Sequence, residues 1–490
     1  MMDRRRFCQG TALACLASAY PPLLHAVNAD TSIPAVSLDG KDIELEAAAV
    51  RELGGALEGP LLLSGHPQYE SARRIWNGMH DKHPALIVRC TGSEDIRHAV
   101  TFARERSLLV AVRGGGHSWP GKSVCEGGMM IDLAPMNQVS VDRERRIATV
   151  SGGALLAHLD AASLQHGLVT TAGVVSHTGV GGFTLGGGFG RLNRKYGLAI
   201  DNLVAAEIIT ADGAVRRISS EQEPDLFWAI RGGGGNFGVV SGFEFQLHPF
   251  ERKVLSGPVV WPVEQAREVL DFYIDWYLDL SDELYVGPTM ASTPDGTPII
   301  LMEVVYAGKP AEGERELEPL RKIGKPLEDG VKVQDYTMMQ TWEDATFHHG
   351  IRSYAKSGMV REMTPALVKD MIDAYVPDTR LAFFTHTAGG AIKRVGELDT
   401  AFPHRKAETM LIVAGTWSDP AQDEEAISLA RDWFGQLAPH TGGYYDNIEF
   451  EGDDRVAGNY GPAYQRLARI KGRYDPENLF RLNSNISPLT

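Results

Sequence analysis

Three consecutive glycines lead directly into a histidine in the segment 112–121. The glycines occupy residues 114–116, His117 follows them, and an apolar run at residues 108–112 precedes them. Because glycine carries no side chain, such a loop lets backbone N–H groups approach a ligand closely. The pattern predicts a ligand-binding loop at the end of a strand, with the His117 imidazole placed to contact the ligand.

Two further glycine clusters occur at residues 172–190 and 232–238, within a chain that holds 53 glycines. Aliphatic and aromatic residues are interleaved with these glycines, so the clusters indicate ligand loops and not flexible linkers. Residues 179–182 resemble part of a dinucleotide-binding fingerprint, which alone is a weak signal.

The elements that position the first loop form a predicted β-α-β unit. Residues 85–89 are a short apolar strand, residues 93–103 carry apolar side chains at helical spacing, and residues 108–113 form the next strand. The glycines follow the second strand, whereas a Rossmann dinucleotide site has them after the first strand and before a helix. The Rossmann fold is therefore excluded.

The chain changes character near residue 253. Before it, glycine clusters alternate with short strands; beyond it, glycine clusters thin out and longer amphipathic helices alternate with strands. Strands are predicted there at residues 285–291, 299–306, 381–387 and 410–417. Antiparallel strands with helices on one face account for this pattern, so the sequence predicts an α+β fold with two domains.

The composition fits an ordinary globular protein, with 43% hydrophobic and 23% charged residues over 490 positions. This length allows more than one folded unit. The net charge of −15 argues against nucleic acid and anionic membrane surfaces as partners.

The N-terminal leader carries twin arginines just before a moderately apolar run at residues 10–20. Small residues at 27–29 offer a cleavage point, and the apolar run is too short to span a membrane. Residues 1–29 are therefore predicted to be a twin-arginine signal peptide that exports the folded protein to the periplasm or outside the cell, with no membrane insertion after processing.

Cys90 and Cys125 are the two cysteines that would remain after cleavage. No CxxC pair or zinc spacing is present. A disulfide between them is compatible with an oxidising compartment but is not indicated by their spacing.

Together these segments resemble the berberine bridge enzyme-like FAD-linked oxidoreductases, within the vanillyl-alcohol oxidase or PCMH-type flavoprotein superfamily. The resemblance covers the mature chain and rests on residues 113–118, 178–190, 194–202, 233–240 and 474–485. It implies a FAD-binding PCMH-type domain at 30–252, a substrate-binding domain at 253–445, and a C-terminal segment at 446–490 that completes the FAD domain.

The resemblance also implies which residues bind FAD. These are Arg113, Gly114, Gly115, Gly116, His117, Ser118, Thr178, Gly179, Gly182, Gly186, Gly187, Gly190, Asp201, Asn202, Gly238, Val239, Val240, Asn483 and Asn485. Glycine-rich loops suit the FAD pyrophosphate because their backbone N–H groups serve as donors.

His117 occupies the position of the family's covalent flavin anchor. Many relatives form a second link through a cysteine, but Val175 stands at that position here and has no thiol. A single covalent link through His117 is expected. Thr178 replaces an aliphatic residue at a position that influences oxygen access in the family, which leaves oxidase and dehydrogenase behaviour both open.

The resemblance implies that a tyrosine in a Tyr-x-Asn pattern, on the strand before the C-terminal helix, removes the substrate proton. Tyr444 is assigned this role, with Asp446 in place of the asparagine and Tyr445 on the opposite face of the strand. His404 is a candidate for the substrate cavity, although a structural hydrogen-bonding role fits it equally well.

The expected activity is hydride transfer from a small-molecule alcohol, sugar or amine to the covalent flavin, followed by reoxidation by O₂, giving H₂O₂, or by another acceptor. Oxidation or ring closure of an aromatic secondary metabolite and a non-catalytic flavin-binding protein are the alternatives.

A serine hydrolase is disfavoured because Pro120 stands where a nucleophile elbow has glycine. No metal is expected, since His348 and His349 lack a third ligand at zinc-type spacing.

Overall fold

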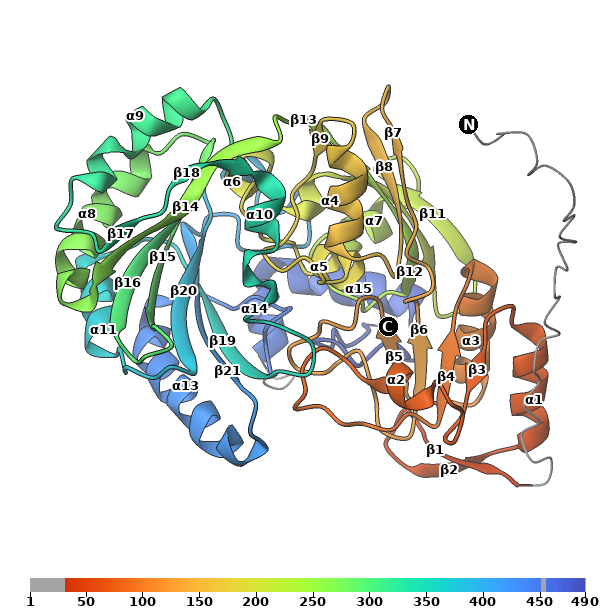
Figure 1. Cartoon of the computed structure of the whole chain (residues 1–490). Coiled ribbons are helices and arrows are strands. Elements are labelled where there is room, and N and C mark those ends of the chain that lie inside the picture. Colours follow the sequence, from red (N-terminus) through yellow and green to blue (C-terminus); the bar gives the residue numbers. More distant parts are fainter. Residues whose placement is uncertain (1–30, 451–454, 490) are drawn as a thin grey trace, which may run out of the picture.

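Two lobes lie side by side in the computed structural model of the chain (Figure 1). It describes residues 31–450 and 455–489, so the predicted signal peptide at 1–29 lies outside the described residues. Within the described residues, no helix is long and apolar enough to cross a membrane. The two-lobed combination of α-helices with largely antiparallel sheets confirms the predicted fold class.

The first lobe begins with a hairpin and a four-stranded sheet of order β3-β4-β6-β5, in which β4 and β5 both pair with β6 in parallel. Helix α3 connects β4 to β5 and thus forms the predicted β-α-β unit. The elements are β1 (Ile33–Val36), β2 (Asp42–Leu45), α1 (Ala47–Ala56), β3 (Leu61–Leu62), α2 (Tyr69–Arg73), β4 (Leu86–Arg89), α3 (Ser93–Glu105), β5 (Val110–Arg113) and β6 (Met129–Asp132).

A second, antiparallel sheet of order β11-β10-β12-β8-β7 completes this lobe. Within it, β7 and β8 are antiparallel neighbours joined by a turn. The elements are β7 (Val139–Asp142), β8 (Ile147–Ser151), α4 (Leu156–Leu164), β9 (Leu168–Val169), α5 (Val180–Leu185), α6 (Asn193–Tyr196), β10 (Leu203–Ile209), β11 (Val215–Ser219), α7 (Pro224–Ile230), β12 (Val239–Gln246) and β13 (His248–Pro249).

The C-terminal helices α14 (Val456–Tyr460) and α15 (Tyr464–Tyr474) return to the first lobe. Leu467 and Ile470 of α15 share one hydrophobic cluster with Leu226 and Phe227 of α7. Burial of these apolar faces against each other fixes the end of the chain beside the glycine clusters.

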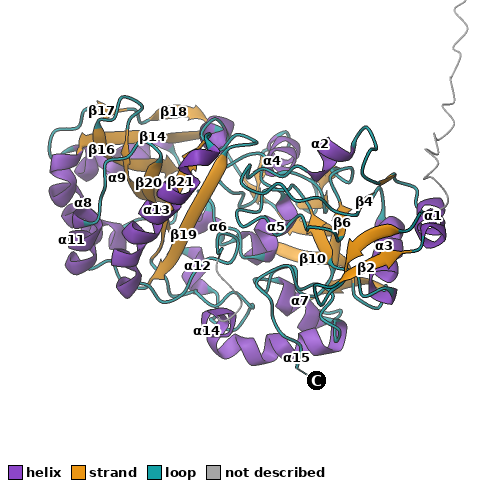
Figure 2. Cartoon of the chain, turned by 90° about the horizontal axis from the view of Figure 1, so that it is seen from below, coloured by secondary structure: helices purple, strands orange, loops and turns teal. Residues whose placement is uncertain are grey.

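The second lobe is built on an eight-stranded antiparallel sheet of order β17-β14-β16-β15-β20-β21-β19, with β18 also paired to β14. Figure 2 shows its long helices on one side of the sheet, away from the first lobe. The elements are β14 (Lys253–Pro262), α8 (Ala266–Trp276), β15 (Leu284–Ser292), β16 (Pro298–Tyr306), α9 (Pro310–Arg321), β17 (Glu328–Asp329), β18 (Lys332–Asp335), α10 (Tyr336–Gln340), β19 (Arg352–Val360), α11 (Pro365–Asp373), β20 (Leu381–Thr387), α12 (Ala391–Arg394), β21 (Thr409–Trp417) and α13 (Asp423–Leu437).

Alternate residues of these strands face opposite sides, as the strand repeat of two requires. On β21, Leu411 and Val413 join the hydrophobic cluster under the helices, whereas Met410, Ile412 and Ala414 face the first lobe. The helices therefore cover one face of the sheet, and the other face is left to line a site.

The two cysteines of the described chain do not form a disulfide. Cys90 and Cys125 are both buried and both free thiols. The Cys90 thiol approaches the Val88 carbonyl and the Cys125 thiol approaches the Met129 carbonyl, so each is held as a small core residue.

Candidate active site

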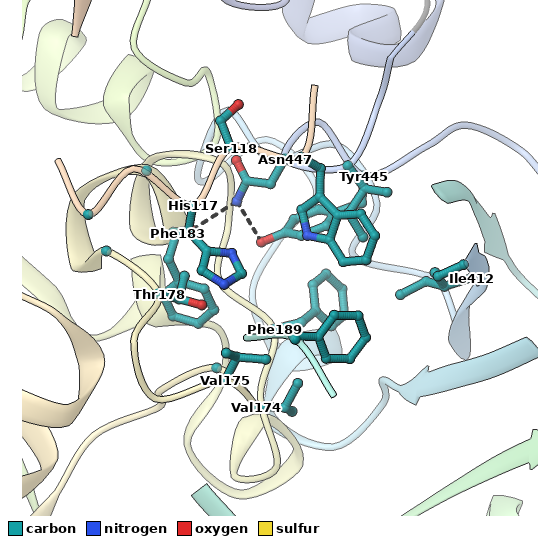
Figure 3. A pocket seen from close by; sticks show the side chains of 18 of the residues that line it. His117, Ser118, Val174, Val175, Thr178, Phe183, Phe189, Ile412, Tyr445 and Asn447 are labelled. Atoms are coloured by element: carbon teal, nitrogen blue, oxygen red, sulfur yellow. Dashed lines mark hydrogen bonds between the residues drawn. The ribbon is translucent and has the colours of Figure 1, made fainter. Parts of the chain in front are cut away.

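A cavity of about 780 Å³ separates the inner face of the eight-stranded sheet from the glycine clusters of the first lobe. One side, here called the glycine wall, comprises the cavity-lining residues of segments 114–118, 173–182 and 234–240. The other side, here called the sheet wall, comprises the cavity-lining residues of β15, β16, β20 and β21. Figure 3 shows the His117 imidazole directed into this space, with Val174 and Val175 nearby and Ile412 of β21 across it.

The glycine wall depends on backbones that touch each other. A Cβ on Gly115 would lie 2.4 Å from the Gly179 Cα, and a Cβ on Gly179 would lie 2.3 Å from the Gly115 nitrogen. Two of the glycine clusters are therefore in direct contact, which no other residue type would permit. A Cβ on Gly182 would meet nothing within 4 Å, so this glycine instead leaves open space at the cavity surface.

His117 is half-buried and packs among aromatic rings. Its imidazole stacks on Trp76 with ring centroids 4.2 Å apart and planes inclined by 13°, and His177 lies 5.0 Å from it on another side. Burial, reinforced by His177 and His349, holds the pKa of His117 well below its usual range. The ring is therefore neutral near pH 7, and its Nε2 atom is buried with no hydrogen-bond partner among the described residues.

The three histidine rings do not form a metal site. His177 lies between His117 and His349, with its ring centroid 4.8 Å from that of His349. No group of three potential ligands is arranged to hold a metal ion within residues 31–450 and 455–489.

Most of the predicted FAD-binding residues meet at this cavity. The lining includes Gly114, Gly115, Gly116, His117, Ser118, Thr178, Gly179, Gly182, Gly238, Val239, Val240 and Asn483. They come from three glycine clusters and the C-terminal segment, which the fold brings together from four distant parts of the sequence.

The other predicted FAD-binding residues are not among those that line the cavity. These are Arg113, Gly186, Gly187, Gly190, Asp201, Asn202 and Asn485. Several of them instead contact the segments that carry the glycine wall, on the side away from the cavity.

Close packing and buried polar contacts explain these positions. A Cβ on Gly190 would lie 1.8 Å from the Ala172 carbonyl oxygen, so this glycine lets two backbones cross. The Asp201 carboxylate accepts two 2.8 Å hydrogen bonds from the buried Arg405 guanidinium. The Asn202 amide donates to the Tyr196 and Leu198 carbonyls, both at 3.0 Å. Such residues position the glycine wall without reaching the cavity.

Tyr445, and not the predicted Tyr444, lies at the cavity. Tyr445 lines the cavity, whereas Tyr444 does not; the Tyr444 ring is buried beneath the Arg455 guanidinium, 4.9 Å from the ring centroid. The prediction assumed a strand, but residues 441–450 form no regular element, so strand alternation does not apply. Tyr445 and Asn447 themselves match the Tyr-x-Asn pattern, a reading that would have identified the cavity residue from the sequence.

Tyr445 is held by two donors. The Asn447 side-chain amide donates to the Tyr445 hydroxyl oxygen at 2.9 Å, and the Gly188 backbone N–H donates to it at 3.1 Å. Figure 3 shows the first of these bonds at the cavity edge. Burial raises the pKa of Tyr445 to about 12, and both hydrogen bonds oppose this rise. The hydroxyl is therefore protonated in the protein alone, with its own hydrogen left for a third partner.

His404 lies outside the cavity lining. It is half-buried, and its Nε2 atom is 3.0 Å from the Asn459 side-chain oxygen. Burial lowers the pKa of His404 to about 4, so the ring is neutral and serves to hold the segment that carries Tyr444.

Sequence reasoning missed the charged residues of the inner cavity. Glu303 on β16 faces the cavity and forms a 2.5 Å ion pair with Arg191, which follows the second glycine cluster. Glu343, from the short 3₁₀ helix Trp342–Asp344 that follows α10, also lines this region. A single glutamate within the apolar strand 298–306 was the available signal, because a charge on a buried strand face needs a partner or a ligand.

The residues present fit a flavin cofactor. The glycine wall exposes backbone at the cavity, His117 contributes a neutral imidazole, and the remaining lining is largely apolar, as an isoalloxazine ring requires.

Comparison with known proteins agrees with this fit. The family model for the FAD binding domain matches residues 84–219, and the model for berberine and berberine-like proteins matches residues 436–487. A FAD-linked oxidoreductase of Dictyostelium discoideum is 30% identical over 447 residues, which cover 90% of this chain and 97% of that protein. The (R)-6-hydroxynicotine oxidase of Paenarthrobacter nicotinovorans is also 30% identical, covering 88% of this chain and 97% of that protein.

Solved structures show the same fold. The crystal structure of 6-hydroxy-D-nicotine oxidase from Arthrobacter nicotinovorans matches with a TM-score of 0.81 at 30% identity, covering 88% of this chain and 98% of that one. A xylooligosaccharide oxidase from Myceliophthora thermophila matches with a TM-score of 0.81 at 22% identity and thus shares the architecture. The chain belongs to the berberine bridge enzyme-like family of FAD-linked oxidoreductases.

Proposed function

We propose that this enzyme oxidises a small organic alcohol or amine in the cavity between its two lobes, using a FAD that is attached to the chain through His117. The single observation that carries the proposal is the state of His117: its imidazole is neutral, and its Nε2 atom has no hydrogen-bond partner among the described residues, on the wall where backbone glycines gather. When bound there, the flavin supplies a hydride acceptor.

The attachment is expected to be a single bond. Val175 lines the cavity on the glycine wall and has no nucleophilic atom, so it cannot supply the second link. The stacking of His117 on Trp76 fixes the imidazole plane and limits its motion. A covalent bond would keep the cofactor with an enzyme that, by its predicted twin-arginine leader, works outside the cytoplasm.

Tyr445 is the residue we assign to the substrate proton. Its oxygen accepts hydrogen bonds from Asn447 and from Gly188, and both stabilise a phenolate form. Since burial keeps the Tyr445 pKa at about 12 in the protein alone, the tyrosine must act through a hydrogen bond to the substrate O–H or N–H group as that proton is lost.

The sheet wall favours a compact substrate with apolar surface. Its lining includes Ala382, Phe384, Met410, Ile412 and Ala414, which contribute few hydrogen-bonding groups. Reoxidation of the enzyme by O₂ or by another acceptor is compatible with Thr178 at the cavity, and either would complete the catalytic cycle.

The proposal is tested by anaerobic mixing of the purified enzyme with a panel of alcohols, sugars and amines, followed by flavin absorbance. We expect one substrate class to bleach the flavin in a concentration-dependent manner, with production of the two-electron oxidised product. If no alcohol, sugar or amine reduces a flavin that dithionite reduces normally, the catalytic role is wrong and the chain is a flavin-binding protein.

A further inference from the structure

We propose that Glu303 and Glu343, together with the Trp342 ring, form a recognition site for a positively charged nitrogen, so that the substrate of this enzyme is a cationic amine. The inference rests on the proposed function and narrows its substrate class. No residue of this group belongs to the glycine wall or to the predicted flavin contacts.

Two carboxylates of the cavity lining, those of Glu303 and Glu343, lie near a single guanidinium, that of Arg191. Arg191 is fully buried and its Nε atom donates to Glu303 at 2.5 Å. Its Nη1 atom lies 3.4 Å from the Val174 carbonyl, and its Nη2 atom is buried without a partner among the described residues. Arg191 is thus paired with Glu303 and packed against the back of the glycine wall, and its charge also lowers the pKa of Glu343, so that two carboxylates share one guanidinium.

Glu343 is that second carboxylate. It lines the cavity, and its side chain forms no hydrogen bond or ion pair with any described residue. The neighbouring Asp344 is tied to the Ser176 backbone and hydroxyl at 2.8 and 2.6 Å, which fixes the segment that carries Glu343 against the first lobe. Burial, and then the charge of Glu303, raise the pKa of Glu343 to about 7, and the nearby Arg191 opposes this rise only in part.

Three further ionisable side chains at the cavity do not form an ion pair with Glu343. The His386 pKa is lowered to about 3 by burial and by Arg191, so this ring is neutral. Arg380 is already paired with Asp378 at 2.7 Å and Glu425 at 2.8 Å. Lys122 donates to the Ser484 hydroxyl at 3.0 Å, beside the C-terminal segment that contributes Asn483 to the lining.

An aromatic surface accompanies the carboxylates. Trp342 precedes Glu343 directly, lines the cavity and is 38% exposed, which is unusual for a tryptophan beside a largely buried site. A tryptophan face attracts organic cations through its ring quadrupole. Carboxylates and an open tryptophan face in one apolar cavity together match an alkylammonium group better than a neutral alcohol or a sugar, whose hydroxyl groups need several polar partners.

The test compares two probes of the same shape that the enzyme cannot oxidise by hydride removal: (3-hydroxyphenyl)trimethylammonium, which is cationic, and 3-tert-butylphenol, which is neutral. Binding to the FAD-loaded oxidised enzyme is measured by calorimetry at pH 8, where Glu343 is ionised. We expect the cation to bind about tenfold more tightly than its neutral isostere, as a desolvated cation–carboxylate and cation–π contact predicts.

Glu343→Gln is the decisive variant because it breaks no ion pair or hydrogen bond of the described residues. It should remove most of the preference for the cation and leave 3-tert-butylphenol binding within about twofold. Glu303→Gln should act in the same direction, and its melting temperature reports whether unpaired Arg191 has disturbed the fold. Glu318→Gln, an exposed residue on α9 paired with Lys322, is the matched control and should change neither affinity.

Equal affinity of the wild-type enzyme for the two probes would overturn the assignment. Failure of both probes to bind at millimolar concentration would overturn it too, as would an equal loss of affinity for both probes in Glu343→Gln. Because the measurement needs no turnover, it separates this inference from the proposed oxidation. An enzyme that prefers the cation but is reduced by no amine would contradict the catalytic proposal alone.

Discussion

The two walls of the cavity are made in different ways. The glycine wall is a backbone surface, in which Gly115 and Gly179 touch and side chains are excluded. The sheet wall is a side-chain surface, in which every second residue of β21 from Met410 to Thr416 faces the cavity while Leu411 and Val413 pack under the helices. The glycine wall therefore fits one ligand shape, because any side chain in place of a glycine would separate the loops. In the sheet wall, by contrast, a lining side chain can be exchanged for another without moving the backbone. This division suits a constant cofactor facing a variable substrate.

The strongest expected effect comes from filling the backbone contact. Gly115→Ala places a Cβ within 2.4 Å of the Gly179 backbone, so the two loops must separate. We expect the variant to lose nearly all bound flavin and to lose about 1–3 kcal/mol of stability. The flavin-to-protein absorbance ratio and thermal unfolding measure both effects.

Gly182→Ala is the matched control, since its added methyl group would meet nothing within 4 Å. It should retain the fold and the stability of the wild type. Equal loss of flavin and stability in both variants would show that the glycine wall does not depend on backbone contact.

Next in size is the effect of removing the cavity tyrosine. Tyr445→Phe deletes the hydroxyl that Asn447 and Gly188 hold, and we expect flavin reduction by substrate to slow by about 10²- to 10⁴-fold. Tyr444→Phe should stay within about twofold of the wild type, because the Tyr444 ring lies outside the cavity. Stopped-flow reduction rates distinguish the two, and the reverse order would restore Tyr444 as the base.

A pair of substitutions on one strand separates stability from recognition. Leu411→Ala removes a side chain from the core under the helices and should cost about 2–5 kcal/mol of unfolding free energy. Ile412→Ala, one residue later, enlarges an existing cavity, so we expect a smaller loss of stability and a changed KM. Urea unfolding and steady-state kinetics give both numbers; a similar profile for the two variants would argue against a two-sided sheet.

The last prediction is a pH dependence of stability that arises between the lobes. Burial raises the pKa of Asp160 to about 7, and a hydrogen bond from Gln340 of α10 opposes this rise. Burial, together with the charges of Glu303 and Asp344, also raises the pKa of Glu343 to about 7, and the charge of Arg191 opposes that rise. Between the ordinary carboxyl pKa and pH 7, the folded chain keeps protons that the unfolded chain has lost. Stability should therefore fall as pH rises through this window, by at most about 1.4 kcal/mol per pH unit for each group.

Asp160→Asn and Glu343→Gln should each flatten this slope, as measured by urea unfolding at pH values from 5 to 8. A slope that neither substitution changes would assign the dependence to other groups.

The difference between the walls also explains what the sequence could predict. His117 and the glycine clusters were recognisable because backbone contact demands glycine, a requirement that is written in the sequence itself. The sheet wall was not predictable, because Glu303 on β16 meets Arg191, 112 residues away in the sequence, only when the two lobes are folded against each other. The choice between Tyr444 and Tyr445 failed for a related reason: it assumed a strand where the chain forms an irregular segment.

Acid denaturation of the wild-type enzyme and of His117→Ala tests the central claim most directly. The wild-type polypeptide should keep its yellow colour and its flavin fluorescence after precipitation and washing, whereas His117→Ala should release all flavin into the supernatant. Flavin that remains bound to the His117→Ala polypeptide, or that leaves the wild-type polypeptide completely, would contradict the claim that His117 is the sole covalent anchor.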